Sequence, residues 1–352
     1  VPENVRQNAV WALTRMKFSE SIDLIYDALT DPSPNVRQVA CNAMSVTRTW
    51  QQVAANQPAE RNIELERNRT ISGALANIVR SDEPDVARSA AVALGRMAEF
   101  RSIGAILGRL GRTPNDQFLE HSLINALIEI DDYKTTHAAL DSENPKVLNG
   151  VVWALHEMPS SQIEIFDILP LIEIEDKQLR ESLVTIAGEH PNWDAGLANR
   201  FFEWSDDLND HRITTLEQFV PRLVGSPPIE DFLSSLAKSD TPEKRSLALN
   251  LIHLSTLASL RPEWLKLVES TLRPDALKED LDNALGIAAS HPNLNLRPML
   301  ETLRDSYNLA PLLHASITAT LEILEEPNSQ ENPPVSGPLA PSSGEEASSS
   351  RE

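Results

Sequence analysis

Cysteine is almost missing from this chain of 352 residues, and its scarcity excludes several kinds of site. A single cysteine, Cys41, cannot form an internal disulfide, a zinc cluster of cysteines or the Cys-x-x-Cys-His motif that attaches c-type haem. Glycine is scarce as well, at 12 residues, and neither GxxxxGK[ST] nor GxGxxG occurs. No run approaches eighteen apolar residues, so the sequence predicts no membrane-spanning helix.

Lysine and arginine are also few compared with aspartate and glutamate. The chain has 31 Lys and Arg against 52 Asp and Glu, a formal net charge of −21. That charge would repel nucleic acid and an anionic membrane surface, which excludes both as expected partners. Aromatic residues make up only 5%, but a hydrophobic fraction of 41% is enough for a sizeable core at this length.

What the chain does have is an internal repeat. An apolar residue stands at position i, a small or apolar residue at i+4, and a pair at i+7 and i+8. The copies begin at Val5, Val36, Val86, Leu119, Val147, Leu179, Arg212, Lys244, Leu277 and Leu309. This spacing follows one stripe of an α-helix. The last five intervals are 32 or 33 residues, so the repeat is close to regular over that part.

Turn signals and a second apolar helix complete each unit. Segments such as Asp31-Pro32-Ser33-Pro34-Asn35 precede most copies and offer N-cap oxygens and a proline for the first helical turn. Between copies lie apolar stretches, for example 22–29, 103–110 and 163–171. We therefore predict an all-α fold, a right-handed α-α superhelix of about ten helical hairpins that bury their faces by stacking.

The repeat also divides the chain. Residues 1–200 match the template well, with an insertion at about 49–70 that we interpret as a solvated extension of one hairpin. Residues 201–324 carry weaker copies and are predicted to continue the same solenoid. Residues 325–352 are rich in Pro, Ser and Glu and are predicted to be a disordered linker or tail. The missing initial Met suggests a fragment of a longer product.

The pattern resembles HEAT repeats. The residues that carry the resemblance are Asp31-Pro32-x-x-Asn35-Val36-Arg37-x-x-Ala40 and Pro84-Asp85-Val86-x-Arg88-x-Ala90. The family implies scaffolding and binding of proteins or neighbouring domains along the concave row of second helices, without catalysis. The resemblance therefore implies that this segment is not an enzyme.

A narrower resemblance covers roughly residues 1–200. The segments 6–15, 116–130 and 187–193 are similar to the HEAT block of large bacterial PVC-type haem-binding proteins, where a dehydrogenase-like domain precedes the repeats and a c-type haem domain follows. The resemblance implies a periplasmic or secreted location, which the residues themselves leave unknown. It implies no cofactor in this segment, and haem in a flanking domain of the parent.

Trp11 and Trp153 both occupy position i+6 of their copies, and Asn42 and Asn125 occupy it in others. A position that accepts Trp and Asn alike indicates the edge of the second-helix row. Together with His156, these residues are the candidate partner-binding set. The alternative is that the tryptophans cover seams between repeats.

Charged residues recur as well. Asp31 and Asp82 stand six residues before Arg37 and Arg88. We interpret them as a structural ladder of Asp–Arg pairs that joins the turns of neighbouring repeats, with an anion-binding arginine row as the alternative. His156-Glu157 and Glu189-His190 are expected to lie on one ridge, solvated rather than metal-binding. Cys41 falls in an apolar slot, which favours packing over nucleophilic chemistry.

Three functional hypotheses are consistent with the sequence. The first is a non-catalytic spacer or docking segment of a larger extracytoplasmic haem-linked oxidoreductase. The second is a stand-alone adaptor that binds a protein on its concave face. The third, more remote, is a bilin-lyase-like HEAT protein, although no acid/base constellation supports catalysis.

Overall fold

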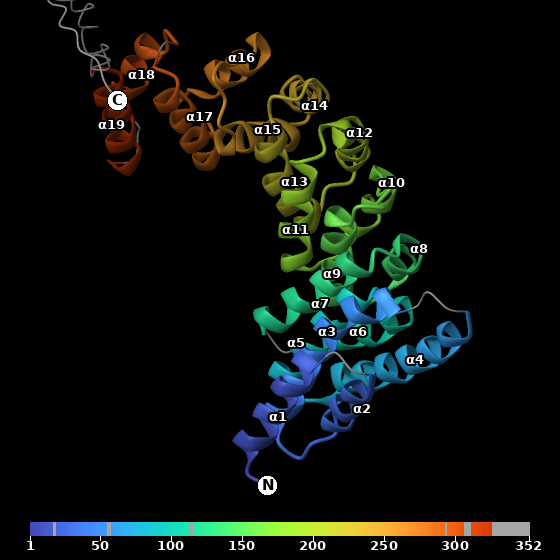
Figure 1. Ribbon diagram of the computed structural model, residues 1–352. Coiled ribbons are helices and arrows are strands. Elements are labelled where there is room, and N and C mark those ends of the chain that lie inside the picture. Colours follow the sequence, from blue (N-terminus) through green and yellow to red (C-terminus); the bar gives the residue numbers. More distant parts are fainter. Residues whose placement is uncertain (17–18, 55–57, 113–115, 293, 306–310, 326–352) are drawn as a thin grey trace, which may run out of the picture. The chain divides into compact units, whose positions relative to one another are not determined.

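The fold is all-α, as the sequence predicts (Figure 1). The computed structural model describes residues 1–16, 19–54, 58–112, 116–292, 294–305 and 311–325. The predicted tail beyond Glu325, residues 55–57 of the predicted insertion, residues 113–115 of a predicted turn signal, and Leu309 at the start of the last copy lie outside these residues. Within them there are α-helices and short 3-10 helices but no strand. The chain divides into two compact units, Val1–Ala258 and Ser259–Glu352.

The predicted copies of the repeat begin the odd-numbered helices. In the first unit these are α1 (Glu3–Met16), α3 (Pro34–Ala54), α5 (Pro84–Met97), α7 (Gln117–Ile130), α9 (Pro145–Glu157), α11 (Lys177–Ala187), α13 (Asp210–Leu223) and α15 (Pro242–Leu254). Each packs against the next, so they form one continuous row, which we call the second-helix row (Figure 1). It is the row that the sequence predicts to be concave.

The even-numbered helices form the other row of the first unit. They are α2 (Ser19–Ala28), α4 (Pro58–Ser81), α6 (Ile103–Leu110), α8 (Tyr133–His137), α10 (Ile165–Ile168), α12 (Asp194–Trp204) and α14 (Pro227–Ala237). Short 3-10 helices join some of them, at Phe100–Ser102, Ala138–Asp141, Leu171–Glu173 and Pro191–Trp193. The second unit contains α16 (Pro262–Thr271), α17 (Lys278–Ser290), α18 (Arg297–Arg304) and α19 (Pro311–Glu325).

The turn signals act in part as the sequence predicts, since the N-caps of α5 and α15, Glu83 and Thr241, form no side-chain cap. Asp116, Asn144 and Asp176 each accept a hydrogen bond from a backbone N–H in the first turn of α7, α9 and α11. Their side chains satisfy donors that have no partner inside the helix. A proline stands at the first turn of α5, α9 and α15, where its missing N–H costs nothing. Local chemistry thus sets where the second-helix row begins in each repeat.

One predicted helix is much shorter than expected. The apolar stretch 163–171 predicts a helix of at least two turns, but α10 has only four residues and is followed by a 3-10 turn at Leu171–Glu173. Pro170 explains the break, because it lacks an N–H and its ring clashes with the preceding turn of a helix. Phe166, on this short helix, is 74% exposed. The described parts of the insertion, residues 49–54 and 58–70, in contrast fall within α3 and α4, which have 21 and 24 residues.

Small residues set the spacing of the second-helix row. Ala40, Ala90, Ala126 and Ala154, at the i+4 or i+7 positions of the template, are all completely buried. Gly95 has a sharper role, because a Cβ there would lie 3.1 Å from the Cα of Ala126. Its absence lets α7 approach α5 closely, and α7 packs less extensively against α9 than against α5. The row therefore opens from α7 onward.

Candidate functional site

A pocket lies where the second-helix row opens, between α7, α9 and α11. Its cavity volume is about 410 Å³. The lining residues come from corresponding turns of three successive repeats, and they are Gln117, Glu120, His121, Ile124, Asn125, Ile128, Asn149, Trp153, Glu157, Gln178 and Ser182. Two of the predicted binding residues, Asn125 and Trp153, are among them.

Trp153 forms one wall of the pocket and is held in place. Its indole Nε1–H donates a hydrogen bond of 2.8 Å to the hydroxyl of Ser182 on the next helix. The ring is half-buried, so one part packs against the protein while another part faces the pocket. Ile124 and Ile128 add an apolar surface from α7. A side chain with an aliphatic stem would find van der Waals contacts there.

Amide groups and a carboxylate form the polar wall. Glu120 Oε1 accepts hydrogen bonds from Asn149 Nδ2 at 3.1 Å and from Gln178 Nε2 at 3.2 Å, which links α7 to both following helices. Asn149 is only 4% exposed. Its Oδ1 is buried and has no hydrogen-bond partner within the described part of the chain. The wall therefore contains one acceptor whose hydrogen-bonding capacity is unused, a costly arrangement in a protein interior.

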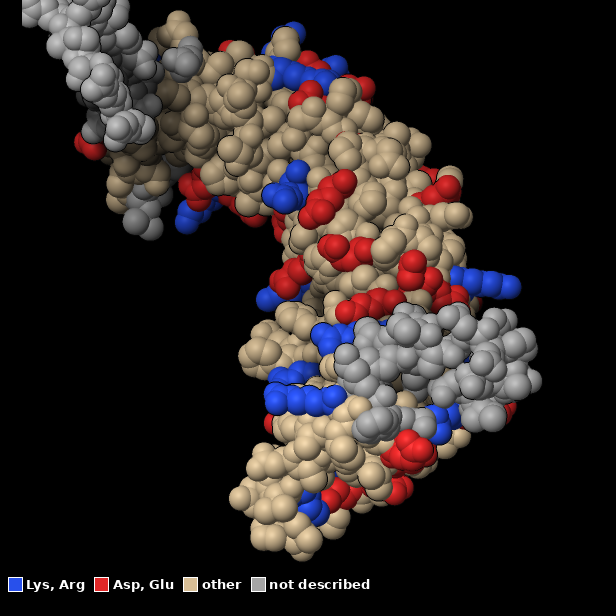
Figure 2. Space-filling model, viewed as in Figure 1, with Lys and Arg blue, Asp and Glu red and all other residues tan. Residues whose placement is uncertain are grey.

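The charge of the pocket has one sign. Glu120 and Glu157 are both among the lining residues, and no Lys or Arg is, as far as the described residues extend. The side chain of Glu157 is 58% exposed, so it is accessible from solvent. Figure 2 shows that carboxylates outnumber cations over the middle of the first unit on the face in view. The pocket is thus suited to a ligand that brings hydrogen-bond donors and positive charge.

His156 belongs to a row of rings beside the pocket. The rings of Trp153, His156, His190 and Trp193 follow one another, with centroid distances of 5.9, 5.2 and 4.0 Å, and the last two are stacked in parallel. His156 Nδ1 and His190 Nε2 lie 3.0 Å apart, and His156 Nε2 lies 3.2 Å from Glu189 Oε2. The ridge expected from the sequence is therefore a chain of hydrogen bonds between α9 and the end of α11.

This arrangement affects the charge of His190. Burial lowers its pKa, and the neighbouring imidazole of His156 lowers it further, while Glu189 acts in the opposite direction. One ring must be an acceptor for the hydrogen bond between the two imidazoles, so both cannot be protonated without breaking it. Across the described residues, no group of three or more His, Cys, Asp or Glu side chains has an arrangement that could hold a metal ion.

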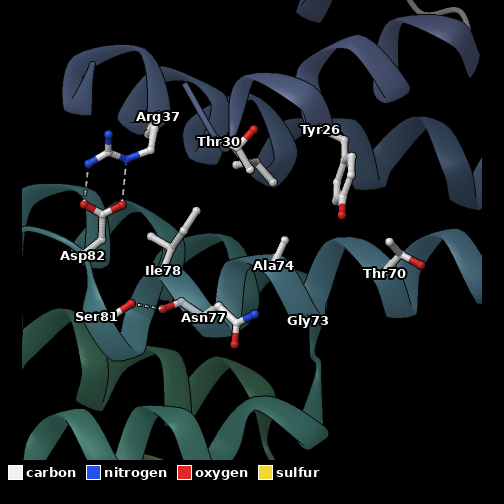
Figure 3. Close-up of a pocket in the computed structure, with 11 residues that line it drawn as sticks. Tyr26, Thr30, Arg37, Thr70, Gly73, Ala74, Asn77, Ile78, Ser81 and Asp82 are labelled. Carbon is white, nitrogen blue, oxygen red and sulfur yellow. Dashed lines mark hydrogen bonds and ion pairs between the residues drawn. The ribbon is translucent and has the colours of Figure 1, made fainter. Parts of the chain in front are cut away.

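The aspartates of the predicted ladder do join neighbouring repeats, but each pairs with a different arginine from the one six residues after it. Arg6 forms two hydrogen bonds with Asp31, at 2.7 and 2.8 Å, and Arg37 forms two with Asp82, at 2.7 and 2.6 Å (Figure 3). Each aspartate is thus bound by the arginine of the preceding second helix. Arg37 still contacts the turn before it through the carbonyl of Asp31. Arg88, which the sequence grouped with this ladder, pairs with Asp85 on its own helix instead.

The pairs keep the carboxylates ionised. Hydrogen bonds from Arg6 lower the pKa of Asp31. At Asp82, burial favours the neutral form, but the hydrogen bonds from Arg37 and from the Glu83 N–H outweigh it and lower the pKa. These arginines are therefore occupied by structural partners and offer no free row for an anion.

A larger groove of about 680 Å³ lies between α2 and α4 (Figure 3). Gly73 helps to open it, because a Cβ at that position would meet no atom within 4 Å. Its charged lining residues are Arg37 and Asp82, which neutralise each other at one end. The groove is larger than the pocket of the second-helix row. Because its charged side chains already pair with each other, it offers less to bind a charged ligand.

The other predicted binding residues lie apart from the pocket. Trp11 is on α1 and is 47% exposed, and Asn42 is half-buried on α3. Neither lines the pocket. The sequence prediction missed Glu120, Asn149 and Ser182. These residues stand at i+1, i+2 and i+3 of their copies, so no single position of the template marks all of them.

A family comparison supports a repeat architecture in the first part of the chain. Residues 2–57 match a family model described as HEAT repeats, which supports the HEAT resemblance over α1 to α3. The chain is 26% identical over 225 residues to a mouse (Mus musculus) protein named amyloid beta precursor like protein 1, and the match covers 60% of this chain. The chain spans about a third of that relative, 34% of its length.

Several solved structures are similar in part. A crystal structure of importin beta aligns with a TM-score of 0.46 and 12% identity over 87% of this chain and 47% of that one. A homology model of the full-length AP-3 complex aligns with a TM-score of 0.40 and 13% identity over 92% and 64%. No helix in the described ranges is both long and apolar enough to cross a membrane.

Proposed function

We propose that the chain is a non-catalytic helical-repeat scaffold that binds a protein partner through the pocket between α7, α9 and α11. The observation that carries the proposal is the pocket itself. Three successive repeats place a fixed tryptophan, exposed amides and two carboxylates around one cavity. Large aromatic side chains beside a polar rim are typical of the centres of protein interfaces.

The position of the pocket supports binding over catalysis. Its lining residues lie on the helices that stack to form the core, so their spacing is fixed by buried alanines and leucines. A rigid surface loses little conformational entropy when a partner binds. Among the described lining residues there is one histidine, His121, which is exposed, and no nucleophile paired with a base.

Photo-crosslinking tests this function. The photoreactive residue p-benzoylphenylalanine is placed at His121, at the pocket, or at Phe166 on α10, which is 74% exposed in the other row. In the native host, the first position is expected to give a discrete crosslinked protein that disappears when Trp153→Ala is added. The control position should not give that product. Equal products from both positions, or none from position 121, would contradict binding at the pocket.

We also propose that this scaffold is a spacer or docking segment of a larger extracytoplasmic haem-linked oxidoreductase. The support is the resemblance of segments 6–15, 116–130 and 187–193 to the repeat block of such proteins. The residues of this chain do not fit covalent haem themselves, because Cys41 is its single cysteine and is fully buried. Haem would therefore be held by another domain.

The size of the native product separates this proposal from a stand-alone adaptor. An antibody to this segment would be used on the host extract, with in-gel haem staining of the same band. A much longer haem-positive band is expected for the spacer. A haem-negative band near the 39.0 kDa of this chain would exclude the spacer and leave the adaptor.

A further inference from the structure

We propose that the pocket between α7, α9 and α11 binds a single basic side chain, lysine or arginine, from an extended segment of the partner protein. This inference rests on the proposed function and specifies the chemistry of its ligand. It follows from three properties of the lining residues: their charge, their unused hydrogen-bond acceptors and their apolar wall.

Charge selects a cation. Glu120 and Glu157 bring two carboxylates to one cavity, and the described lining residues include no Lys or Arg to neutralise them. Glu120 is oriented by two amide N–H groups, from Asn149 and Gln178, which fix its position without supplying a positive charge. An anionic ligand would be repelled, and an apolar ligand would remove a carboxylate from water without a partner.

Hydrogen bonding favours a ligand with several N–H donors. Asn149 Oδ1 is buried and unpartnered among the described residues, and it lies on the pocket wall. Asn125 is exposed on the neighbouring helix and adds an amide oxygen. An ammonium group has three donors and a guanidinium has five, with no acceptor in either. Such a group could satisfy the carboxylates and the exposed amide oxygen of Asn125 together.

The apolar wall suits the stem of the same side chain. Trp153, Ile124 and Ile128 line the cavity. Lysine and arginine carry three or four methylene groups that pack on apolar surface while the charged end remains in a polar environment. A cation over the face of a tryptophan is attracted by the negative face of the ring, more strongly where the cation is desolvated. The groove in Figure 3 offers no such site, because Arg37 already occupies Asp82.

A binding experiment with small probes tests the proposal on the full chain. The protein is labelled with 5-fluorotryptophan, and the ¹⁹F signal of Trp153 is assigned with Trp153→Phe. The probes are the methylamides of Nα-acetyl-arginine, Nα-acetyl-lysine and Nα-acetyl-citrulline. Citrulline has nearly the shape of arginine without its charge. Arginine and lysine are expected to shift the Trp153 signal saturably, with citrulline at least about 5-fold weaker.

Matched variants locate the charge that matters. Glu157→Gln and Glu120→Gln should each weaken binding of the arginine probe by about 5-fold. Glu129→Gln removes the same charge from an exposed position on α7 that does not line the pocket, and it should leave affinity unchanged. Glu120→Gln could disturb folding through Asn149, so thermal unfolding by circular dichroism is measured first. If Glu120→Gln is less stable, the test rests on Glu157→Gln, which changes an exposed position.

The result that overturns the proposal is specific. Citrulline binding as tightly as arginine, equal weakening by Glu129→Gln, or the absence of any saturable shift would each exclude a site for a basic side chain. The photo-crosslink from position 121 does not depend on the probe. A crosslink that persists while the arginine preference fails would therefore retain the scaffold function and reject only its ligand chemistry.

Discussion

At the scale of single residues, burial decides what Cys41 can do. The side chain is completely buried on α3, which confirms its predicted place in an apolar slot. Desolvation raises its pKa to about 12. At pH 8 only about one thiol in ten thousand would then be ionised, and the thiolate is the reactive form. We expect the native protein to resist alkylation by iodoacetamide and to react fully in urea. Rapid labelling of the native chain, seen as a mass increase, would contradict this.

The Arg37–Asp82 pair should contribute to stability more than a surface ion pair does. Both side chains are mostly buried, at 17% and 12% exposed. Arg37→Met would leave the carboxylate of Asp82 without its main partner, and we expect a loss of about 2 kcal/mol in unfolding free energy. The measurement is a urea denaturation series followed by circular dichroism.

Arg88→Met is the matched control for this prediction. Arg88 pairs with Asp85 on the same helix, and the two side chains are 36% and 73% exposed. Such pairs contribute little, so we expect a change within about 0.5 kcal/mol. Asp82→Asn in the Arg37→Met background should recover part of the stability, because it removes the unpaired charge. Equal effects of the two arginine substitutions would mean that the ladder is not structural.

At the scale of elements, the contact between His156 and His190 makes the seam from α9 to α11 sensitive to pH. The pKa of His190 is lowered in the folded chain, so the unfolded chain binds its proton first as the pH falls. Stability from this group is complete above about pH 6.5, the ordinary histidine value, and decreases as the pH falls toward the lower folded value.

Hydrogen exchange at pH 7.5 and 5.5 would measure this effect. After correction for the intrinsic rate, amides of α9 and α11 should lose protection at the lower pH. His190→Gln keeps a polar group of similar size but does not titrate, so the loss should be smaller in that variant. The same loss in both proteins would assign the pH dependence to other groups.

Most of the helix pattern could be predicted from the sequence, whereas the site could be predicted only in part. The repeat template marks the odd-numbered helices correctly. The reason is that the buried apolar stripe and the residues of the preceding turn both depend on one helix alone. Trp153 and Asn125 were predicted as edge residues for the same reason. Glu120 and Asn149 were not, because their roles depend on the lateral distance between α7, α9 and α11.

At the scale of the whole molecule, the two compact units should unfold separately. Residues of a stacked repeat contact mainly their neighbours, so cooperativity need not extend over the entire chain. Each unit also has its own large buried side chains, such as Trp204 in the first and Trp264 in the second. We expect peptides from α12–α13 and from α16–α17 to lose exchange protection at different urea concentrations. Coincident midpoints would show a single cooperative structure.

The two rows of the first unit differ in how much change in length they accept. The helices opposite the second-helix row range from four residues in α10 to 24 in α4. Each second helix must instead present a buried apolar stripe to both neighbours. Insertions and deletions should therefore be tolerated in the even-numbered row while the pocket keeps its geometry. That row is the place to attach a fluorophore, an affinity tag or an additional domain without affecting the binding surface.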